Sequence, residues 1–453
     1  MIEAPSRREG KQKQAQGAAD GMFAYYLQLA WRSLGRNRVL TTLMVLALAL
    51  GIGACITTLT VLRLLSGDPL PGRSAQLYYP QIDPYPKEGY VPGQSKPQEN
   101  LTWVDAMNLF DAHRAPRQAL VALGSAKVEP RREGSRPFFG DVVMTTADFL
   151  PMVGAPFVYG SAWSASDDTA GARVVVIADF LNRKLFGGAN SVGRMVHLNG
   201  HDYRVVGVLG HFSPQPRFYA LNIGRSYGDG DAAFLPLRAG RANDMQPNNI
   251  SCWETADIEH LETAPCMWLG LWVQLPDAAA VAGYQRFLDG YVHEQIAQGR
   301  FHRTETALPD LMQWLRNENV VPDDARLQAG LAMGFLLICV TNTIGLLLAK
   351  CLRRSREIGV RRALGATRGA IFGQFMVEAA IIGLAGGLLG LVFAELGLWG
   401  IRHQPADYAD LARLDLSMFA FTFLVALVSA LVAGILPAWR ACAVAPAPQL
   451  KNA

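Results

Sequence analysis

Four long stretches of the chain carry almost no charge, and they separate membrane-compatible segments from soluble ones. They are residues 40–65, 327–350, 370–396 and 416–439. As helices rising 1.5 Å per residue, each can cross the roughly 30 Å hydrocarbon core of a bilayer. Helices buried in a large soluble core are usually shorter and keep a polar face, and a cleaved signal peptide has a shorter apolar segment. The pattern therefore predicts a membrane α-helical protein with four transmembrane helices.

Basic residues lie unequally beside these spans. Residues 1–40 hold seven Lys and Arg, and residues 350–370 hold another seven, but residues 397–415 hold only two, against three Asp. Cytoplasmic segments carry the excess of Lys and Arg. We therefore expect a multi-pass protein of the inner (plasma) membrane with both termini in the cytoplasm. The N-terminal segment 1–39 with an amphipathic entry helix, the loop 351–369 and the tail 440–453 would be cytoplasmic.

The long segment 66–326 and the short loop 397–415 would then lie outside. From residue 67 to residue 326 there are 23 basic and 29 acidic residues, so the overall charge of +4 reflects membrane topology and indicates no nucleic-acid partner. Helical and strand patterns alternate in this segment. Residues 102–115 and 278–298 read as helices, residues 172–179 as a buried strand, and Asn199-Gly200 as a hairpin turn. We expect a large α+β extracytoplasmic domain between spans one and two.

Candidate chemistry in the outside segment is limited. Cys252 and Cys266 are its only cysteines, and an oxidising compartment would allow them to pair; two unpaired buried thiols are the alternative. His197 and His201 flank the hairpin turn without an obvious third ligand, so we interpret them as surface residues and expect no metal. The chain has no GxxxxGK[ST] or HExxH motif. We expect no catalytic residues and no cofactor of its own.

The basic loop contains apolar residues at helical spacing. Glu357 and Arg361 stand four residues apart in the favourable order, which predicts a short helix. Val360, Ala363 and Leu364 fall on one face of it and Arg361 and Arg362 largely on the other, with Ile358 as an exception. Gly365 is placed to end this helix and Thr367 to cap the next. Contact with anionic membrane lipids alone would explain the arginines but not the apolar residues and glycines.

Residues 353–390, RRSREIGVRRALGATRGAIFGQFMVEAAIIGLAGGLLG, resemble the FtsX-like permease domain. The entry into span one (residues 29–54) and the outside segments 145–160 and 174–210 resemble MacB-like permeases and their periplasmic core domain. Residues 213–272 match nothing recognisable in that family. The resemblance implies the permease of an ABC transporter of the mechanotransmitting type. Such permeases form dimers, here with a second copy or a paralogue, and bind ABC ATPase subunits.

The resemblance also assigns roles to residues. It places the coupling helix, which contacts the ATPase, at Arg356, Glu357, Ile358, Gly359, Val360, Arg361, Arg362, Leu364, Gly365, Ala366 and Thr367. About 40 residues precede span one, so we expect ATP to be bound by a separate ATPase subunit.

The implied function is export or extraction of an amphipathic substrate, such as a drug, peptide, lipid or lipoprotein. A periplasmic adaptor and an outer-membrane channel are candidates for further partners. The alternative is a regulatory module that controls an envelope enzyme, but the size of the outside domain favours transport.

Small residues and one acid stand out inside the spans. Glycines four residues apart allow helices to approach closely, within one subunit or across a dimer. They are Gly330 and Gly334 in span two, and Gly383, Gly386, Gly387 and Gly390 in span three. Glu378 lies about two turns into span three, where an unpaired charge is costly. We expect it to bond to a neighbouring helix; a proton-relay role is the less favoured alternative.

Overall fold

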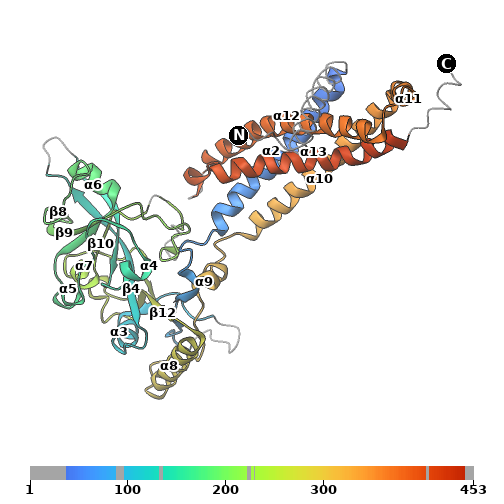
Figure 1. Cartoon of the computed structure of the whole chain (residues 1–453). Coiled ribbons are helices and arrows are strands. Elements are labelled where there is room, and N and C mark those ends of the chain that lie inside the picture. The colour runs from blue at the N-terminus through green and yellow to red at the C-terminus, as the bar shows by residue number, and fades with distance from the viewer. Residues whose placement is uncertain are drawn as a thin grey trace, which may run out of the picture. The chain divides into compact units, whose positions relative to one another are not determined.

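The computed structural model describes residues 37–87, 96–131, 136–221, 226–228, 230–404 and 408–443 (Figure 1). The chain forms two compact units. One combines residues up to Leu64 with those from Pro322 onward, and the other consists of Leu65–Val321. The predicted entry helix within residues 1–39 lies almost wholly outside the described residues, because these begin at Asn37.

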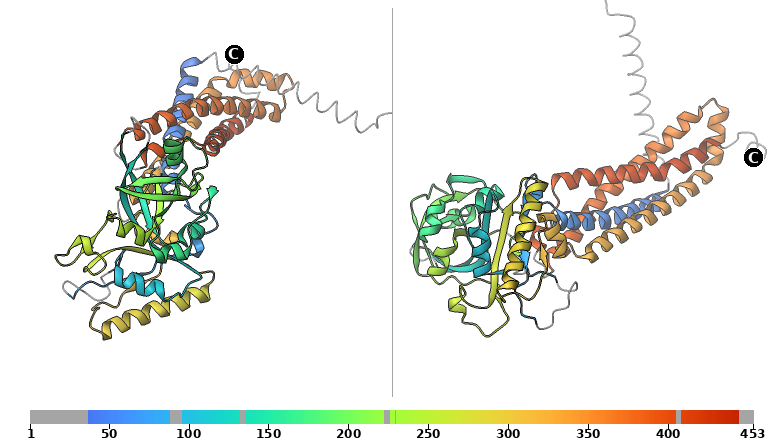
Figure 2. Two further views of the ribbon diagram at one scale, coloured as in Figure 1. Left: turned by 90° about the vertical axis from the view of Figure 1, so that its left-hand side faces the viewer. Right: turned by 90° about the horizontal axis from the view of Figure 1, so that it is seen from below.

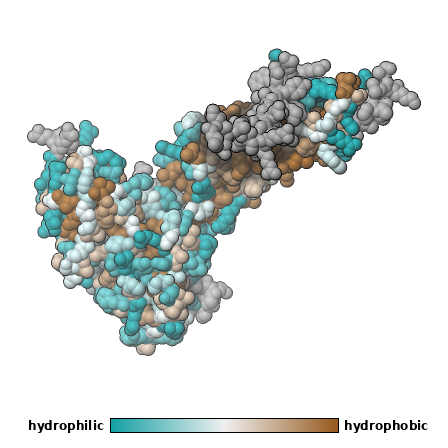
Figure 3. Space-filling view, in the orientation of Figure 1, coloured by the Kyte–Doolittle hydropathy of each residue, from teal (hydrophilic) through white to brown (hydrophobic). Residues whose placement is uncertain are grey.

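The first unit is a bundle of four long helices: α2 (Arg38–Ser66), α10 (Asp323–Arg353), α12 (Arg368–Arg402) and α13 (Leu416–Ala443). Each is long and apolar enough to cross a membrane, as the sequence predicts. The helices extend past the predicted spans by up to six residues, and Pro437 lies inside α13 without ending it. The views in Figure 2 show them running alongside one another, and the visible bundle surface is largely hydrophobic (Figure 3). An apolar exterior of this kind suits contact with lipid.

The glycines of α12 pack against two neighbouring helices of the same chain. A Cβ added at Gly387 would stand 2.7 Å from the Cβ of Ala426 in α13, and one at Gly383 would clash with Ala430. On the other side, Gly386 and Gly390 lie against Leu48 and Ile52 of α2, which belong to the buried core of the bundle. By contrast, a Cβ at Gly330 or Gly334 of α10 would meet no described atom within 4 Å. The chain itself therefore uses only the α12 glycines for close helix approach among those predicted.

The second unit is built on a mixed sheet, with eleven strands among the described residues. Its main order is β1-β12-β4-β5-β10-β7-β9-β6, with β3 and β11 added on β12, and β8 joined to β4 and β9. Only the β5–β10 and β7–β9 pairs are parallel. The strands are β1 (Leu77–Tyr78), β3 (Leu101–Thr102), β4 (Arg117–Glu129), β5 (Phe138–Thr145), β6 (Phe157–Gly160), β7 (Val174–Ile177), β8 (Met195–Leu198), β9 (His201–Leu209), β10 (Ala233–Pro236), β11 (Ser251–Cys252) and β12 (Cys266–Gln274). A separate pair joins β2 (Gln81–Ile82) to β13 (Thr306–Ala307).

Helices cover this sheet, and two clusters of buried side chains form its core. The helices are α3 (Trp103–Asp111), α4 (Phe149–Val153), α5 (Ala165–Ala170), α6 (Asp179–Phe186), α7 (Leu237–Ala242), α8 (Ala278–Ala297) and α9 (Leu311–Asn317). Figure 1 and Figure 2 show α3 beside α8, and Tyr291 of α8 donates a hydrogen bond of 2.7 Å to Asp105 of α3. The four-helix membrane fold with an intervening mixed α and β domain is as predicted.

Three local predictions for this domain are confirmed. The Thr102 side chain caps α3 by accepting a hydrogen bond from the Asp105 amide. All four residues of β7 are buried. Asn199 and Gly200 both have positive φ, at 48° and 81°, as a type I′ turn requires. Residues 213–272, for which the sequence suggested no structure, supply β10, α7, β11 and most of β12, so they provide central strands of the sheet.

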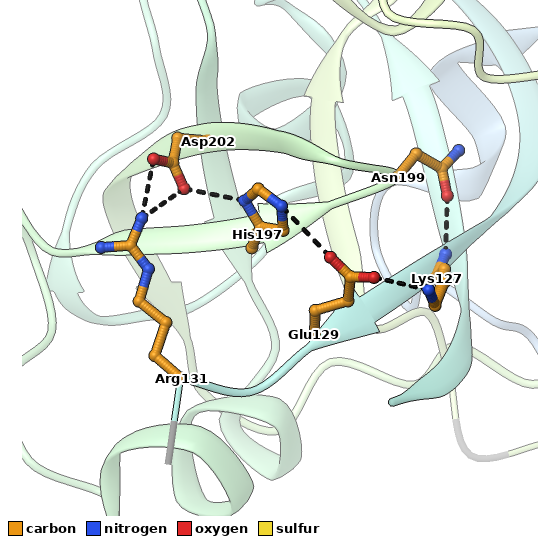
Figure 4. Close-up of polar contacts among 6 residues, drawn as sticks. All are labelled: Lys127, Glu129, Arg131, His197, Asn199 and Asp202. Carbon is orange, nitrogen blue, oxygen red and sulfur yellow. Dashed lines mark hydrogen bonds and ion pairs between the residues drawn. The ribbon is translucent and has the colours of Figure 1, made fainter. Parts of the chain in front are cut away.

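The hairpin β8–β9 is held to β4 by a polar cluster (Figure 4). The His197 ring lies between two carboxylates, with Nε2 3.1 Å from Glu129 and Nδ1 3.0 Å from Asp202. Lys127 pairs with Glu129 at 2.6 Å, and Arg131 with Asp202 at 2.6 Å. Hydrogen bonding from Lys127 lowers the pKa of Glu129, and hydrogen bonding from His197 and then Arg131 lowers the pKa of Asp202. Both ring nitrogens of His197 therefore contact carboxylates that are also paired with Lys127 or Arg131.

Cys252 and Cys266 are joined by a disulfide. They face each other in register across β11 and β12. The disulfide ties the edge strand β11 to the long buried strand β12. This is the arrangement that the oxidised alternative requires.

Candidate functional site

The basic loop between α10 and α12 folds as a short helix that ends at a glycine. Helix α11 (Ser355–Ala363) begins after a break at Arg354. Leu364 is its C-cap residue, and Gly365 follows with φ +99°. The amide of Gly365 donates to the carbonyl of Arg362 at 3.2 Å, and that of Ala366 donates to Arg361 at 3.0 Å. This is the Schellman pattern of hydrogen bonds that ends a helix at glycine. Thr367 then caps α12 through the Ala370 amide, so both predicted boundaries are confirmed.

One side of α11 is anchored in the bundle. Ile358 is only 6% exposed and belongs to a small apolar cluster with residues of α10, α12 and α13; its neighbour Gly359 is buried as well. The other members of the cluster are Cys351, Ile371, Phe375, Ala438, Ala441 and Cys442. Ile358 did not fit the predicted apolar face because its side chain packs into the bundle. It fixes the loop to the membrane helices and is not available to contact a partner.

The two arginines at the end of α11 also bind the chain's own helices. Arg361 donates to Gln374 of α12 at 3.0 Å and to Glu357 at 2.7 Å, which confirms the predicted pair with Glu357. Arg362 donates to the backbone carbonyl of Cys442 in α13 at 3.2 Å. Charge reversal at either position would therefore disturb the seating of the loop, and would not test partner contact alone.

The opposite side of α11 is exposed and partly apolar. Leu364 is 83% exposed and Val360 is 50% exposed. Ala363 and Thr367 are exposed too, as is Arg356 one turn before Val360. We call these five residues the outward face: Arg356, Val360, Ala363, Leu364 and Thr367. The prediction that Val360, Ala363 and Leu364 share one face is confirmed, and large apolar side chains exposed side by side at a loop indicate a surface that meets another molecule.

A buried ion pair joins α10 to α12 next to this loop. The ammonium group of Lys350 contacts a carboxylate oxygen of Glu378, and both side chains are 1% exposed. Arg354 approaches the second oxygen of Glu378 at 4.0 Å. Lys350, which was counted among the basic residues of segment 350–370, is therefore buried within the bundle. Glu378 does bond to a neighbouring helix as expected, but its partner stands 28 positions earlier in the chain, and the sequence gave no signal of which residue it binds.

Two protein-family profiles match the chain. The sequence profile of the MacB-like periplasmic core domain matches residues 41–289, more than half of the chain, and that of the FtsX-like permease C-terminal region matches residues 329–446. The first match includes the stretch 213–272 that sequence reasoning could not place.

Several characterised proteins align along nearly the whole chain. The pyoverdine export ATP-binding/permease protein PvdT of Pseudomonas aeruginosa is 26% identical over 464 residues, covering 97% of this chain and 61% of that protein. The macrolide export ATP-binding/permease protein MacB of Nitrobacter winogradskyi is 24% identical over 434 residues, covering 92% and 58%. The chain thus spans about three fifths of the length of these relatives.

Among solved structures, the periplasmic region of MacB from Actinobacillus actinomycetemcomitans matches with a TM-score of 0.37 and 14% identity, covering 57% of this chain. The profile matches carry the assignment, because together they extend over both units. The chain belongs to the MacB/FtsX-like family of ABC permeases.

Proposed function

We propose that this chain is the membrane-spanning subunit of an ABC exporter and that the outward face of α11 docks on an ABC ATPase. The observation that carries the proposal is the division of α11 into an anchored side and an exposed apolar side. The anchored side holds the helix to three membrane helices. The exposed side leaves Val360 and Leu364 for a partner.

A protein groove suits this face better than lipid headgroups do. Anionic lipid attracts Lys and Arg near the membrane surface, and its contribution depends on charge. Four of the five outward-face residues are uncharged, and the arginines Arg361 and Arg362 are engaged within the chain. A helix presenting apolar side chains at i, i+3 and i+4 spacing is a usual way to fill a hydrophobic groove.

Motion of the ATPase would reach the membrane through the same contacts. A displacement of α11 acts on α12 through Ile358 and Arg361, and the Lys350–Glu378 pair connects α12 to the last turn of α10. Helix α10 begins directly after the sheet domain, at Asp323. We therefore propose mechanical transmission from ATP hydrolysis to the extracytoplasmic domain, with ATP bound by a separate partner subunit.

The proposal extends to a second copy of the chain, a substrate and further components of an export route. The glycines Gly330 and Gly334 are exposed on α10 and have no described neighbour, which supports a contact with a second copy of the chain. The relatives are named for export, which supports outward transport, and we propose that the substrate is amphipathic. A periplasmic adaptor and an outer-membrane channel would complete the route. Both termini would lie in the cytoplasm, so an impermeant thiol reagent should label a cysteine at Gln404 but not at Ser355.

Removing the apolar groups of the outward face tests the proposal. The variant Val360→Ser/Leu364→Ser is expected to reach the membrane at normal levels but to lose co-purification with the ABC ATPase subunit. Leu352→Ser is the matched control, because Leu352 is 71% exposed in the same region but lies outside the outward face. Normal ATPase recruitment and turnover in the double variant would refute docking by this face. ATP-driven movement of a labelled amphipathic peptide in proteoliposomes separates an exporter from a regulatory module.

A further inference from the structure

The sheet domain contains a cavity that nothing in the proposed function uses. Its volume is about 380 Å³, and it lies between α3, β4, α5, α7 and the turn before α4. One part of the lining is apolar and includes Trp103, Met107, Phe110, Leu120 and Leu237. Cavities of roughly 300–1,000 Å³ lined by aromatic and aliphatic side chains with a few polar groups are typical of small-molecule sites.

The polar part of the lining is mainly acidic. Asp111, Asp148 and Asp168 contribute three carboxylates, and the basic side chains are Arg238, which is exposed, and His113. Asp168 is held in place because its carboxylate accepts hydrogen bonds from the Ala147 amide at 2.6 Å and from the Trp163 indole at 2.7 Å. Burial raises the pKa of Asp168 to about 6, so this carboxylate is poorly solvated and would gain from a cationic partner.

The wall of the cavity also contains a buried amide. Gln118 lines the same cavity and is 3% exposed. Its amide nitrogen donates to the backbone carbonyl of Phe110, but its oxygen Oε1 is buried without a hydrogen-bond partner among the described residues. A buried acceptor left unsatisfied costs about 1–3 kcal/mol.

We infer that this cavity binds a small cationic amphiphile, a molecule with an apolar ring body and a protonated amine. The ring body packs against Trp103, Phe110 and Leu120, where the aromatic faces also attract the cation. The ammonium group is neutralised by Asp148 and Asp168. A divalent metal is a poorer occupant, because no group of three or more His, Cys, Asp or Glu in the described part of the chain is arranged to hold one.

This binding does not depend on whether α11 docks an ATPase, so the two proposals can fail separately. The test uses the full chain in lipid nanodiscs and isothermal titration calorimetry with two matched probes. They are 1-naphthylmethylamine, which is cationic at pH 7.5, and the neutral 1-naphthylmethanol. Empty nanodiscs give the partitioning of each probe into lipid. We expect saturable binding of the amine, at least tenfold tighter than that of the alcohol.

Variants show whether the cavity is the site. Asp148→Asn/Asp168→Asn is expected to weaken amine binding at least tenfold and to leave alcohol binding unchanged. Asp111→Asn, at an exposed position on the cavity rim, should weaken amine binding to a smaller extent and serves if the double variant does not fold. The control is Asp244→Asn, which removes an exposed carboxylate outside the cavity at a residue with φ +58°, a backbone conformation that asparagine accepts.

Three results would overturn the inference. One is the absence of saturable amine binding beyond that of empty nanodiscs. Another is equal affinity for the amine and the alcohol. The third is wild-type amine affinity in folded cavity variants, or a loss in Asp244→Asn as large as theirs, because either would place the cation elsewhere.

Discussion

Replacing Glu378 by glutamine should destabilise the helix bundle more than any comparable change at its surface. The substitution keeps the size of the side chain but removes the charge that neutralises Lys350. Both side chains are 1% exposed, so water cannot replace the lost partner. Breaking a buried ion pair from one side typically costs about 3–5 kcal/mol, which corresponds to a factor of about 10² to 10⁴ in the unfolding equilibrium.

The surroundings of the pair predict an order among the variants. Lys350→Met should cost less than Glu378→Gln, because Glu378 keeps Arg354 at 4.0 Å whereas Lys350 would face a neutral amide. The double variant Lys350→Met/Glu378→Met should be nearer to the wild type than Glu378→Gln, since apolar replacements remove both desolvation costs. With Glu378→Met as the second single variant, a double-mutant cycle then gives a coupling free energy of the order of 1–3 kcal/mol.

The assay is reversible unfolding of the purified chain in mixed micelles with increasing SDS, followed by helical circular dichroism. Glu395→Gln is a suitable control, because its partner Arg402 is 21% exposed and Glu395 is 51% exposed, and exposed pairs contribute about 0–1 kcal/mol. The reasoning is wrong if Glu378→Gln unfolds within about 1 kcal/mol of the wild type. It is also wrong if the double variant loses more free energy of unfolding than the two single variants lose in sum.

Three further predictions follow from other parts of the chain. Gly387→Leu should prevent the bundle from packing because Ala426 lies 2.7 Å from the added Cβ, whereas Gly334→Leu should leave each chain folded and shift cross-linked dimers to monomers; equal effects on folding would contradict the assignment. The lowered pKa values of Glu129 and Asp202 stabilise the fold above the ordinary carboxyl range, and this contribution disappears as pH falls through the folded pKa values. His197→Ala should therefore lower the melting temperature more at pH 5.5 than at pH 3, and a larger effect at pH 3 would contradict this reasoning. Peptide mass spectrometry without reductant should find Cys252 linked to Cys266, and Cys252→Ser should cost about 3 kcal/mol in the chain-entropy model while Cys442→Ser shows no change in peptide linkage.

Sequence reasoning worked where one local cause decides the structure. Four apolar stretches specify four membrane helices because the bilayer requires about 20 apolar residues in each. Gly365 and Thr367 mark the ends of two helices because few other residues satisfy the same backbone groups. The turn at Asn199-Gly200 is another example, since it requires two successive residues with positive φ.

Sequence reasoning failed where contacts between residues far apart in the chain decide the structure. Nothing in the local pattern tells that Ile358 turns inward, because the apolar cluster that receives it comes from α10, α12 and α13. Lys350 resembled a loop charge until α12 brought Glu378 against it. The cavity under α3 joins residues from five elements, and no single segment carries its signature.

Site-specific photo-cross-linking tests the central claim most directly. A benzoylphenylalanine placed at Leu364, which is 83% exposed on the outward face, should cross-link to the ATPase subunit in membranes. The same group at Leu352, also exposed but off that face, should not. Strong cross-linking from Leu364 and little from Leu352 is the predicted result. Cross-linking from Leu364 only to lipid, or equally from both positions to the ATPase, would contradict docking through the outward face of α11.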